Sequence, residues 1–501
     1  MTIRKLTTAL LASVAMTSGA FATDLRIGLQ EDPDALDTDQ ARTFVGRIVF
    51  ESLCDKLVNI TPDLEFVPEL ATEWEWSDDA LTLTMQLRED AVFHDGTPFD
   101  AEAVVANIER SKTLDESRRK SELASVERVE ATGTYEVTFT LTAPDATLIA
   151  QLSDRAGMML SPSAAAEKGL GLANDPVCSG PYQFVERIQQ DRIVLEKFTD
   201  HYDADSYNFD RLIFLPIPDT TVRLANLRSG DLDMLERLAP SDAAGVQSDS
   251  NLTFSAATSL GYQGITVNLH NGPRAETPFG QDARVRRALS LAIDREVINQ
   301  VVFEGAYTAG NQPFAPTSPW YDQTNPVEAR DVEAAKALLA EAGLEGIQIE
   351  IQAPNNPVQL QLMQVIQAMA AEAGIEISIK ATEFATMLSE QTAGNYEGSQ
   401  VGWSGRTDPD GNIHAFVTCA GGLNDSKFCS EEVDNLLNEA RLSTETSDRK
   451  ASYDAANAIL SDALPIIYLY HQTWLWAMSN DIEGFTAYPD GMIRLAGVTK
   501  E

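Results

Sequence analysis

Apolar and polar residues alternate with a period of two at several places along the chain, as they do in half-buried strands. The segments with this pattern are 81–87, 135–141, 347–351 and 375–380. Between the last two, apolar residues recur at helical spacing and predict a helix over 358–373, namely Leu360, Met363, Ile366, Met369 and Ala370. A strand, a helix and a strand in that order favour parallel pairing, so the pattern predicts an α/β fold.

Capping residues indicate where two further helices begin. Asp100 precedes a helix whose apolar residues Val104, Val105 and Ile108 share one face. Asp331 opens a second helix over 332–342, and Gly343 follows it in the position typical of a C-terminal cap.

The N-terminus has the pattern of a secretory signal peptide. Arg4 and Lys5 precede the apolar run 6–16, and Ala20-Phe21-Ala22 has the small-x-small form of a cleavage site. We therefore predict a signal peptide over 1–22 and a mature protein that starts at Thr23. No Cys lies near the cleavage site, so we expect no direct membrane anchor and a soluble, periplasmic protein.

Length and charge narrow the class of protein. A chain of 501 residues exceeds the size at which one core normally keeps growing, so at least two domains are expected. The formal net charge of −39 argues against binding to nucleic acid or to anionic membranes, which need clustered Lys and Arg. We interpret the charge as a contribution to solubility; steering of cations toward a cleft is the alternative.

Four Cys residues lie beyond the signal peptide, and export permits disulfides. Cys419 and Cys429 flank a turn-rich segment and could close it, which leaves Cys54 and Cys178 to pair. Closing that second loop, of roughly 120 residues, would stabilise the fold by at most about 5 kcal/mol. The alternative is that these thiols are free and buried.

The chain shows no motif of an enzyme, a metal site or a cofactor site. Its five His residues have no HExxH or zinc-finger spacing, and neither a GxSxG elbow nor a GxxxxGK[ST] phosphate loop occurs. We therefore expect no cofactor and no metal, and these residues give no positive support for an enzyme.

Five segments carry a resemblance to a known family. FHDGTPFDAEAV at 93–104 follows a strand, and SGPYQFVE begins at residue 179. The others are IPDTTVRLANLRSGDLD at 217–233, RVRRALSLAIDR at 284–295 and LPIIYLYH at 464–471. In this order they resemble the family 5 solute-binding proteins, the peptide, nickel and opine receptors of bacterial ABC importers, over nearly the whole mature chain.

The resemblance implies a periplasmic binding protein-like fold of the large, three-subdomain class, with two lobes joined by a hinge of two strand crossings. It places the core of lobe I at 23–66, 190–259 and 481–501, the extra subdomain of lobe I at 67–189, and lobe II at 260–480. The ligand would lie between the lobes, which close over it by hinge motion.

The loop at 402–412 is the main candidate for ligand contact, because it is rich in turn formers and follows an expected strand. Trp403 would supply a stacking wall. In the peptide receptors a similar loop supplies an Asp that takes the ligand's ammonium, but here Arg406 follows Gly405. An Arg at this position suits an acidic ligand group. If the correspondence is shifted by two residues, Asp408 takes the ammonium instead.

A second departure concerns the carboxylate end of the ligand. Dipeptide receptors have an Arg after a segment like 353–357, but no Arg follows it here. The ligand classes that fit an acidic group facing Arg406 are γ-linked or modified peptides, opine-like conjugates and glutathione-like thiol peptides.

Further candidates for the cleft carry less weight. Arg42 and Thr43 begin the first expected helix and could direct backbone N–H groups at an anion. Tyr262 lies at the expected crossing between the lobes, and Arg155 is a cation that could equally be part of a structural pair. Of Trp474 and Trp476 only one is expected to line the cleft, and Trp474 is the candidate.

The predicted function is that of the substrate-binding component of an ABC importer, a monomer that captures a peptide or peptide-like solute and delivers it to permease subunits. The alternatives are a ligand-sensing receptor for chemotaxis or signalling, a periplasmic chaperone, and a secreted hydrolase built on the same fold.

Overall fold

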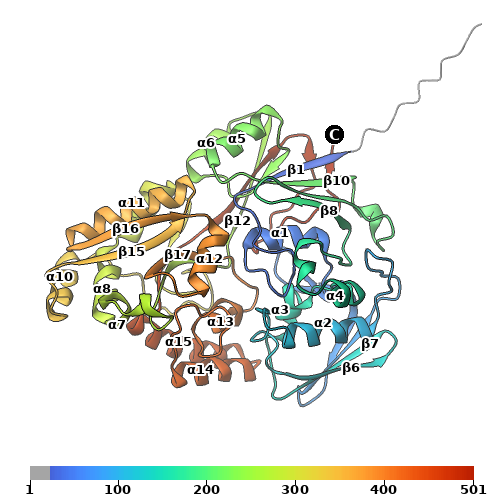
Figure 1. The fold of residues 1–501 in the computed structure, drawn as a ribbon, viewed down its shortest axis with the longest axis horizontal. Helices are drawn as coiled ribbons and strands as arrows, with labels where there is room; N and C mark the ends of the chain where they lie inside the picture. The colour runs from blue at the N-terminus through green and yellow to red at the C-terminus, as the bar shows by residue number, and fades with distance from the viewer. Residues whose placement is uncertain (1–22) are drawn as a thin grey trace, which may run out of the picture.

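A computed structural model describes residues 23–501, and the signal peptide expected at 1–22 lies outside these described residues. The chain forms two large sheets, one of seven strands and one of six, which lie in different parts of the molecule (Figure 1). We call the part built on the seven-stranded sheet, with a smaller four-stranded sheet beside it, lobe I. The part built on the six-stranded sheet is lobe II. The mixed α/β construction agrees with the sequence prediction.

The seven-stranded sheet combines segments from both ends of the chain. Its strands, in spatial order, are β12 (Leu252–Thr258), β19 (Thr473–Ser479), β11 (Met234–Leu235), β1 (Asp24–Leu29), β10 (Arg211–Pro216), β9 (Arg192–Lys197) and β8 (Tyr182–Ile188). Strand β1 is parallel to β10 and β11, and the other pairs are antiparallel. The helices of this part are α1 (Phe44–Leu53), α5 (Thr220–Ser229) and α6 (Pro240–Gln247).

The smaller part of lobe I has its own core under an antiparallel sheet. Its strands are β4 (Ala71–Trp76), β5 (Thr82–Leu87), β7 (Glu136–Leu141) and β6 (Val126–Gly133). Its helices are α2 (Ala101–Thr113), α3 (Leu148–Leu152) and the 3-10 turn η1 (Arg155–Gly157), whereas α4 (Pro162–Lys168) packs on the core of the seven-stranded sheet. Asp100 caps α2 by accepting a hydrogen bond from the Ala103 N–H, as its position before the apolar stripe predicts.

Lobe II is built on the six-stranded sheet. Its strands, in order, are β14 (Thr308–Ala309), β18 (Ile466–His471), β13 (Tyr262–Val267), β17 (Gly398–Trp403), β15 (Ile347–Pro354) and β16 (Ile375–Thr382). Its longer helices are α8 (Ala283–Ala292), α9 (Arg295–Phe303), α10 (Val332–Glu341), α11 (Pro357–Glu372), α12 (Phe384–Thr392), α14 (Glu431–Leu442) and α15 (Thr446–Ala463). The parallel pairing of β15 with β16 across α11 confirms the predicted strand–helix–strand unit.

Short elements complete the structure. The strands are β2 (Val58–Ile60), β3 (Phe66–Pro68), β20 (Ile482–Glu483) and β21 (Thr499–Lys500). The helices are α7 (Pro278–Gln281), α13 (His414–Val417) and the 3-10 helices η2 (Gly169–Asn174), η3 (Ala204–Ser206), η4 (Pro273–Ala275) and η5 (Pro409–Asn412). Between residues 23 and 501, no helix combines the length and the apolarity that a membrane crossing needs.

Two crossings connect the large sheets. Strand β12 of lobe I leads directly into β13 of lobe II, and β18 of lobe II leads into β19 of lobe I through Gln472. This differs from the expected lobe II range of 260–480, because β19 pairs with β11 and β12. Both β18 and β19 are buried along nearly their whole length, so their apolar pattern could not show which sheet each joins.

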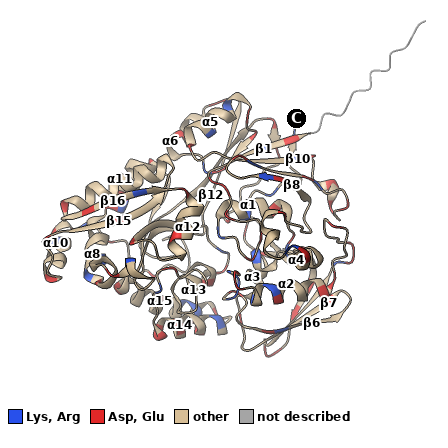
Figure 2. Ribbon diagram, in the orientation of Figure 1, with Lys and Arg blue, Asp and Glu red and all other residues tan. Residues whose placement is uncertain are grey.

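A second difference concerns the extra subdomain expected at 67–189. Strand β8 pairs with β9 and therefore belongs to the seven-stranded sheet, so the separate core ends before Tyr182. Both predicted disulfides are present: Cys54 pairs with Cys178 at the end of α1, and Cys419 pairs with Cys429 in lobe II. Acidic and basic residues occur in both lobes (Figure 2).

Candidate functional site

One cavity, which we call the main cavity, lies where the two lobes meet at the crossings. It has a volume of about 110 Å³ and is lined by both lobes. Lobe I supplies Gln30, Glu31, Arg42, Phe44, Thr220, Arg237, Leu238, Ala239, Pro240, Thr473 and Trp474. The lobe II residues used below are Tyr262, Gln263, Gln359, Leu388, Gln400, Trp403, Phe416, Leu423 and Asp425, with Gln472 at the second crossing.

Aromatic side chains form two walls of the main cavity. In lobe I, Phe44 at the start of α1 stacks on Trp474 of β19, with ring centroids 4.3 Å apart and planes 6° apart. In lobe II, the strand register places Tyr262 of β13 beside Trp403 of β17. Phe416 contacts both of these rings edge-on. Such rigid apolar surface is what a ligand-binding cavity uses to hold flat or extended groups.

Glu31 and Arg237 place two opposite charges at the lobe I side of the main cavity. The Arg237 Nη1 lies 3.5 Å from the Glu31 Oε1, too far for a good hydrogen bond. Neither Glu31 Oε1 nor Arg237 Nε has a hydrogen-bond partner in the described part of the chain. The guanidinium instead lies over the aromatic wall, with its Cζ 4.6 Å from the Phe44 centroid and 5.5 Å from that of Trp474.

The backbone around these two residues is held firmly. Arg237 has a left-handed conformation with φ of 49°, unusual for a residue other than glycine, and Arg223 holds its carbonyl oxygen with a 2.9 Å hydrogen bond. Burial raises the pKa of Glu31 to about 7, with Glu236 adding to the rise while Arg237 opposes it. The Glu31 carboxyl is therefore poised to gain from a cationic partner.

Arg42 joins the lobes across the edge of the main cavity. From the loop before α1 it donates a 2.7 Å hydrogen bond to Asp425 and further bonds to Thr392 and the Leu388 carbonyl, all of lobe II. The Cys419–Cys429 disulfide closes the loop that carries Asp425. Thr43, the next residue, caps α1 by accepting from the Gly46 N–H at 3.3 Å and does not line the main cavity.

Glutamine side chains supply neutral hydrogen-bonding groups. Gln263 donates to the Gln472 Oε1 at 3.3 Å at the paired crossings. Gln400 Oε1, Gln472 Nε2 and Gln359 Oε1 are buried and lack a partner among residues 23–501. Buried amides without partners lose free energy, so these atoms favour a polar ligand in the cavity.

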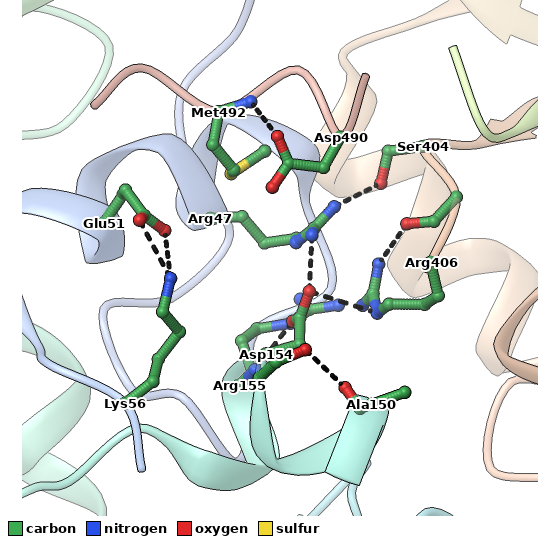
Figure 3. A network of polar contacts seen from close by, with 12 residues as sticks. Arg47, Glu51, Lys56, Ala150, Asp154, Arg155, Ser404, Arg406, Asp490 and Met492 are labelled. Carbon is green, nitrogen blue, oxygen red and sulfur yellow. Dashed lines mark hydrogen bonds and ion pairs between the residues drawn. The ribbon is translucent and has the colours of Figure 1, made fainter. Parts of the chain in front are cut away.

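The remaining candidates from the sequence do not line the main cavity. Arg406 turns away from it: its Nε lies 3.2 Å from Asp154 of lobe I, and its Nη1 donates to the Gly405 carbonyl at 2.9 Å (Figure 3). Gly405 has φ of 91°, and a Cβ there would lie 2.5 Å from the Leu260 backbone, so this position packs tightly against the first crossing.

Asp408 and Arg155 are likewise held by protein groups. Asp408 pairs with Arg449 through hydrogen bonds of 2.6 and 2.9 Å. Arg155 donates to the Ala41 carbonyl at 2.7 Å. Of the sequence candidates, the structure therefore brings Trp403, Tyr262, Arg42 and Trp474 together around one cavity. A ligand-binding role for the others stays a prediction.

Sequence reasoning missed Glu31, Arg237, Phe44 and the glutamines. Glu31 follows the first strand and Arg237 follows β11, and both places are ends of strands that lie side by side in the sheet. Strand ends of α/β proteins commonly carry ligand groups, and this is the one signal that could have singled them out.

Two lobes joined by paired strand crossings, with a mixed polar and aromatic cavity between them, define a ligand-binding protein. The family model for bacterial extracellular solute-binding proteins, family 5 Middle, matches residues 65–424. The chain belongs to this family, as its sequence segments predicted.

Individual relatives agree with that assignment. The dipeptide-binding protein of Escherichia coli K12 is 28% identical over 87% of this chain and 86% of its own length. The glutathione-binding protein GsiB of Pectobacterium atrosepticum is 27% identical over 94% of this chain and 92% of its own. The structure of AgaA from A. tumefaciens R10 in complex with agropinic acid matches with a TM-score of 0.86 and 26% identity, covering 95% of this chain and 99% of that chain. The family and these relatives are binding proteins rather than enzymes.

Proposed function

We propose that this chain is the periplasmic ligand-capturing component of an ABC importer, and that its ligand is a small peptide-like solute with both an amino group and an acidic group. Its relatives bear the names of receptors for dipeptides and glutathione, and a structural neighbour holds agropinic acid. These compounds combine amino-acid and carboxylate chemistry, which the described cavity residues can meet.

The Glu31–Arg237 pair is the observation that carries this proposal. Both side chains face the main cavity, and both keep polar atoms without partners, Glu31 Oε1 and Arg237 Nε. A ligand ammonium near Glu31 and a ligand carboxylate near Arg237 would each gain a charge-assisted hydrogen bond at a buried position, where electrostatic attraction is stronger than in bulk water. A ligand with only one of these groups would leave the other protein charge unmatched.

Cavity size supports a short ligand. One water molecule needs about 10–15 Å³ by the same measure, so a cavity of about 110 Å³ holds roughly ten water-sized positions. This suits an amino-acid conjugate or a dipeptide rather than an extended oligopeptide. The stacked rings of Phe44 and Trp474 would hold the ligand's body, and the glutamine amides would orient its polar atoms.

Capture requires no chemistry at the ligand. The lobes would close about the crossings, burying the ligand, and contacts such as Arg42 with Asp425 would form across the seam. The permease would then recognise the closed form.

The proposal is tested by a thermal-shift screen of the mature protein against di- and tripeptides, glutathione, γ-glutamyl peptides, opines and nickel chelates, with affinities then measured by calorimetry. A ligand at about 100 times its dissociation constant adds roughly 2.7 kcal/mol to stability. We expect stabilisation by zwitterionic compounds that carry an acidic group.

The variant Arg237→Gln should weaken binding of such a compound at least about tenfold, because its carboxylate loses a charged partner. The matched control is Arg287→Gln, which removes the same charge from a partly exposed residue of lobe II that pairs with Glu328. Stabilisation by nickel chelates alone, or unchanged affinity in Arg237→Gln, would contradict the proposed ligand class.

A further inference from the structure

A second and smaller cavity lies along the same seam, beside the main one. It has a volume of about 10 Å³, close to one water-sized position, and Arg406, Glu122, Gln151 and Arg441 are part of its lining. Trp403 and Leu423 line both cavities, so the two are neighbours separated by shared walls.

Buried arginines from both lobes gather around Arg406, which lines this small cavity together with the acidic residue Glu122. We call Arg47, Arg119, Arg155, Arg406, Asp154 and Glu122 the seam cluster. Asp154 accepts hydrogen bonds from Arg47 and from the Arg155 backbone N–H, and it pairs with Arg406 at 3.2 Å (Figure 3). Arg119 donates to Glu122 at 2.5 Å.

The seam cluster contains more positive than negative charge. Four guanidinium groups face two carboxylates. The neighbouring acids pair with other cations: Asp410 with Arg441, Asp39 with Arg110, which also holds Asp37, and Asp490 with Arg494, which also holds Glu51. Arg47 also lies near Asp490. If Arg47 is counted with Asp490, Arg119, Arg155 and Arg406 still share only Asp154 and Glu122.

Several donors of the seam cluster are buried and unused. Arg406 Nη2, Arg155 Nε and Nη2, and Arg119 Nε and Nη2 have no hydrogen-bond partner among residues 23–501. The exposed fractions of these three residues are only 6%, 1% and 0%. Buried cations with unused donors are costly unless a further anion or polar group joins them.

The electrostatics of the arginines agree with this shortage of negative charge. Burial and the nearby Arg47 together lower the pKa of Arg406 to about 9, against the opposing effect of Asp154. Burial together with Arg119 and Arg406 also lowers the pKa of Arg155 well below its usual value. Both guanidinium groups would therefore gain from an added anion.

We propose that the seam cluster is an anion-binding subsite, in which Arg406, the arginine of the cluster that lines the small cavity, receives one small, singly charged anionic group between the lobes, with Arg155 and Arg119 as neighbouring buried cations. The group is either a carboxylate of the captured ligand, reaching past Trp403, or a free monovalent anion such as chloride. The first case rests on the proposed function, and the second does not.

The test measures thermal unfolding of the mature protein in sodium chloride, sodium bromide or sodium formate against sodium gluconate at equal ionic strength. Gluconate is too large for a cavity of about 10 Å³. Small anions at high occupancy should raise the melting temperature by about 2 °C or more relative to gluconate. The gain should disappear in Arg406→Gln and persist in the charge-matched Arg287→Gln.

If Arg406→Gln does not fold, the test uses anomalous diffraction from a crystal of the native protein soaked in bromide. An anomalous peak within hydrogen-bonding distance of Arg406 Nη2 would support the subsite.

A comparison of two dipeptides, both measured in gluconate, distinguishes a ligand carboxylate from a free anion. γ-Glutamylglycine carries an additional carboxylate, and alanylglycine is the analogue with a neutral side chain. Stabilisation by bromide and chloride assigns the site to a free anion, whether or not any peptide binds. Stabilisation by γ-glutamylglycine alone, lost in Arg406→Gln, assigns it to the ligand. No stabilisation by any of these probes and no bromide peak would overturn the subsite.

Discussion

Two charged regions lie between the lobes and differ in how their charges are used. At the seam cluster, the Asp154 carboxylate contacts arginines from both lobes. The Arg406 Nε lies 3.2 Å from it, and the Arg155 backbone N–H donates a 2.6 Å hydrogen bond to it. In the main cavity, Glu31 and Arg237 lie 3.5 Å apart without a hydrogen bond. In the first region the carboxylate is fully engaged between the lobes and only some guanidinium N–H donors stay unused, whereas in the second region both the acid and the base keep polar atoms without a partner.

The difference shows that a charge near a cleft is not by itself evidence of ligand contact. Arg406 lies in the loop at 402–412, whose Trp403 lines the main cavity, yet its side chain points into the seam and pairs with Asp154. Arg237 lies in a tight, left-handed turn, and its guanidinium remains over the aromatic wall of the cavity. Partners and burial, rather than position in a loop, decide which charge a ligand can reach.

The largest expected effect comes from removing the carboxylate of the seam cluster. Burial alone would raise the pKa of Asp154, but Arg406 and Arg47 hold it well below its usual range, so the group is charged in the folded protein. Asp154→Asn would leave several buried arginines without their counter-charge, and we expect a loss of about 3–5 kcal/mol in the free energy of unfolding. Chemical denaturation measures this directly.

The matched control is Asp191→Asn, because Asp191 pairs with Arg192 at an exposed site. Exposed pairs contribute about 0–1 kcal/mol, so the control should be near native stability. An Asp154→Asn protein as stable as this control would mean that the seam cluster does not hold the lobes together.

The next largest effect concerns how stability depends on pH through Glu31 in the main cavity. The pKa of Glu31 is about 7 in the folded protein against 4.5 in the unfolded chain, so the folded state binds this proton more tightly. The stability that Glu31 contributes is therefore full below pH 4.5 and is lost as the pH rises toward 7. Glu31→Gln should remove that loss, worth up to about 3 kcal/mol, and be more stable than the native protein at pH 8.

The measurement is the free energy of unfolding of the native protein and of Glu31→Gln, each at pH 4.5 and at pH 8. The difference between the two proteins at each pH separates the effect of Glu31 from that of other titrating groups. Glu130→Gln, at an exposed pair with Arg128, serves as the control. An advantage of Glu31→Gln that is the same at both pH values would show that Glu31 is not held protonated by burial.

Much of the architecture could be predicted from sequence because it is local. Period-two segments became β5, β7, β15 and β16, and Asp100 and Asp331 cap helices as their positions predicted. The order of the family segments then supplied the two-lobed arrangement. What local patterns do not encode is which sheet a doubly buried strand joins, and β19 shows this by crossing back to lobe I.

The site was predicted only in part, for a related reason. Trp403 and Tyr262 were found because they lie in a recognisable loop and at a crossing. Glu31 and Arg237 are isolated charges in the sequence, and only the parallel pairing of β1 with β11 brings them to one sheet edge. The direction of the Arg406 side chain depends on Asp154, about 250 residues earlier in the chain, which no local pattern reveals.

The smallest of these effects concerns closure rather than either region alone. Arg42 touches the main cavity and also holds Asp425, Thr392 and the Leu388 carbonyl across the seam. Arg42→Met keeps most of the apolar stem but removes these bonds, so it should shift the population toward open forms and weaken ligand binding about fivefold, or about 1 kcal/mol. Small-angle scattering of the unliganded protein, alongside calorimetry, should show a larger radius of gyration.

Arg192→Met is the control for Arg42→Met, because it breaks an exposed pair within lobe I and leaves the seam untouched. If Arg42→Met weakened binding without any change in the unliganded shape, its guanidinium would act on the ligand directly. The bonds to Asp425 would then be a consequence of closure rather than a contribution to it. In that case the seam cluster would still hold the lobes together independently of Arg42. The losses of stability caused by Arg42→Met and Asp154→Asn should then be additive in the double variant. If both residues instead contribute to closure, the two losses should be coupled.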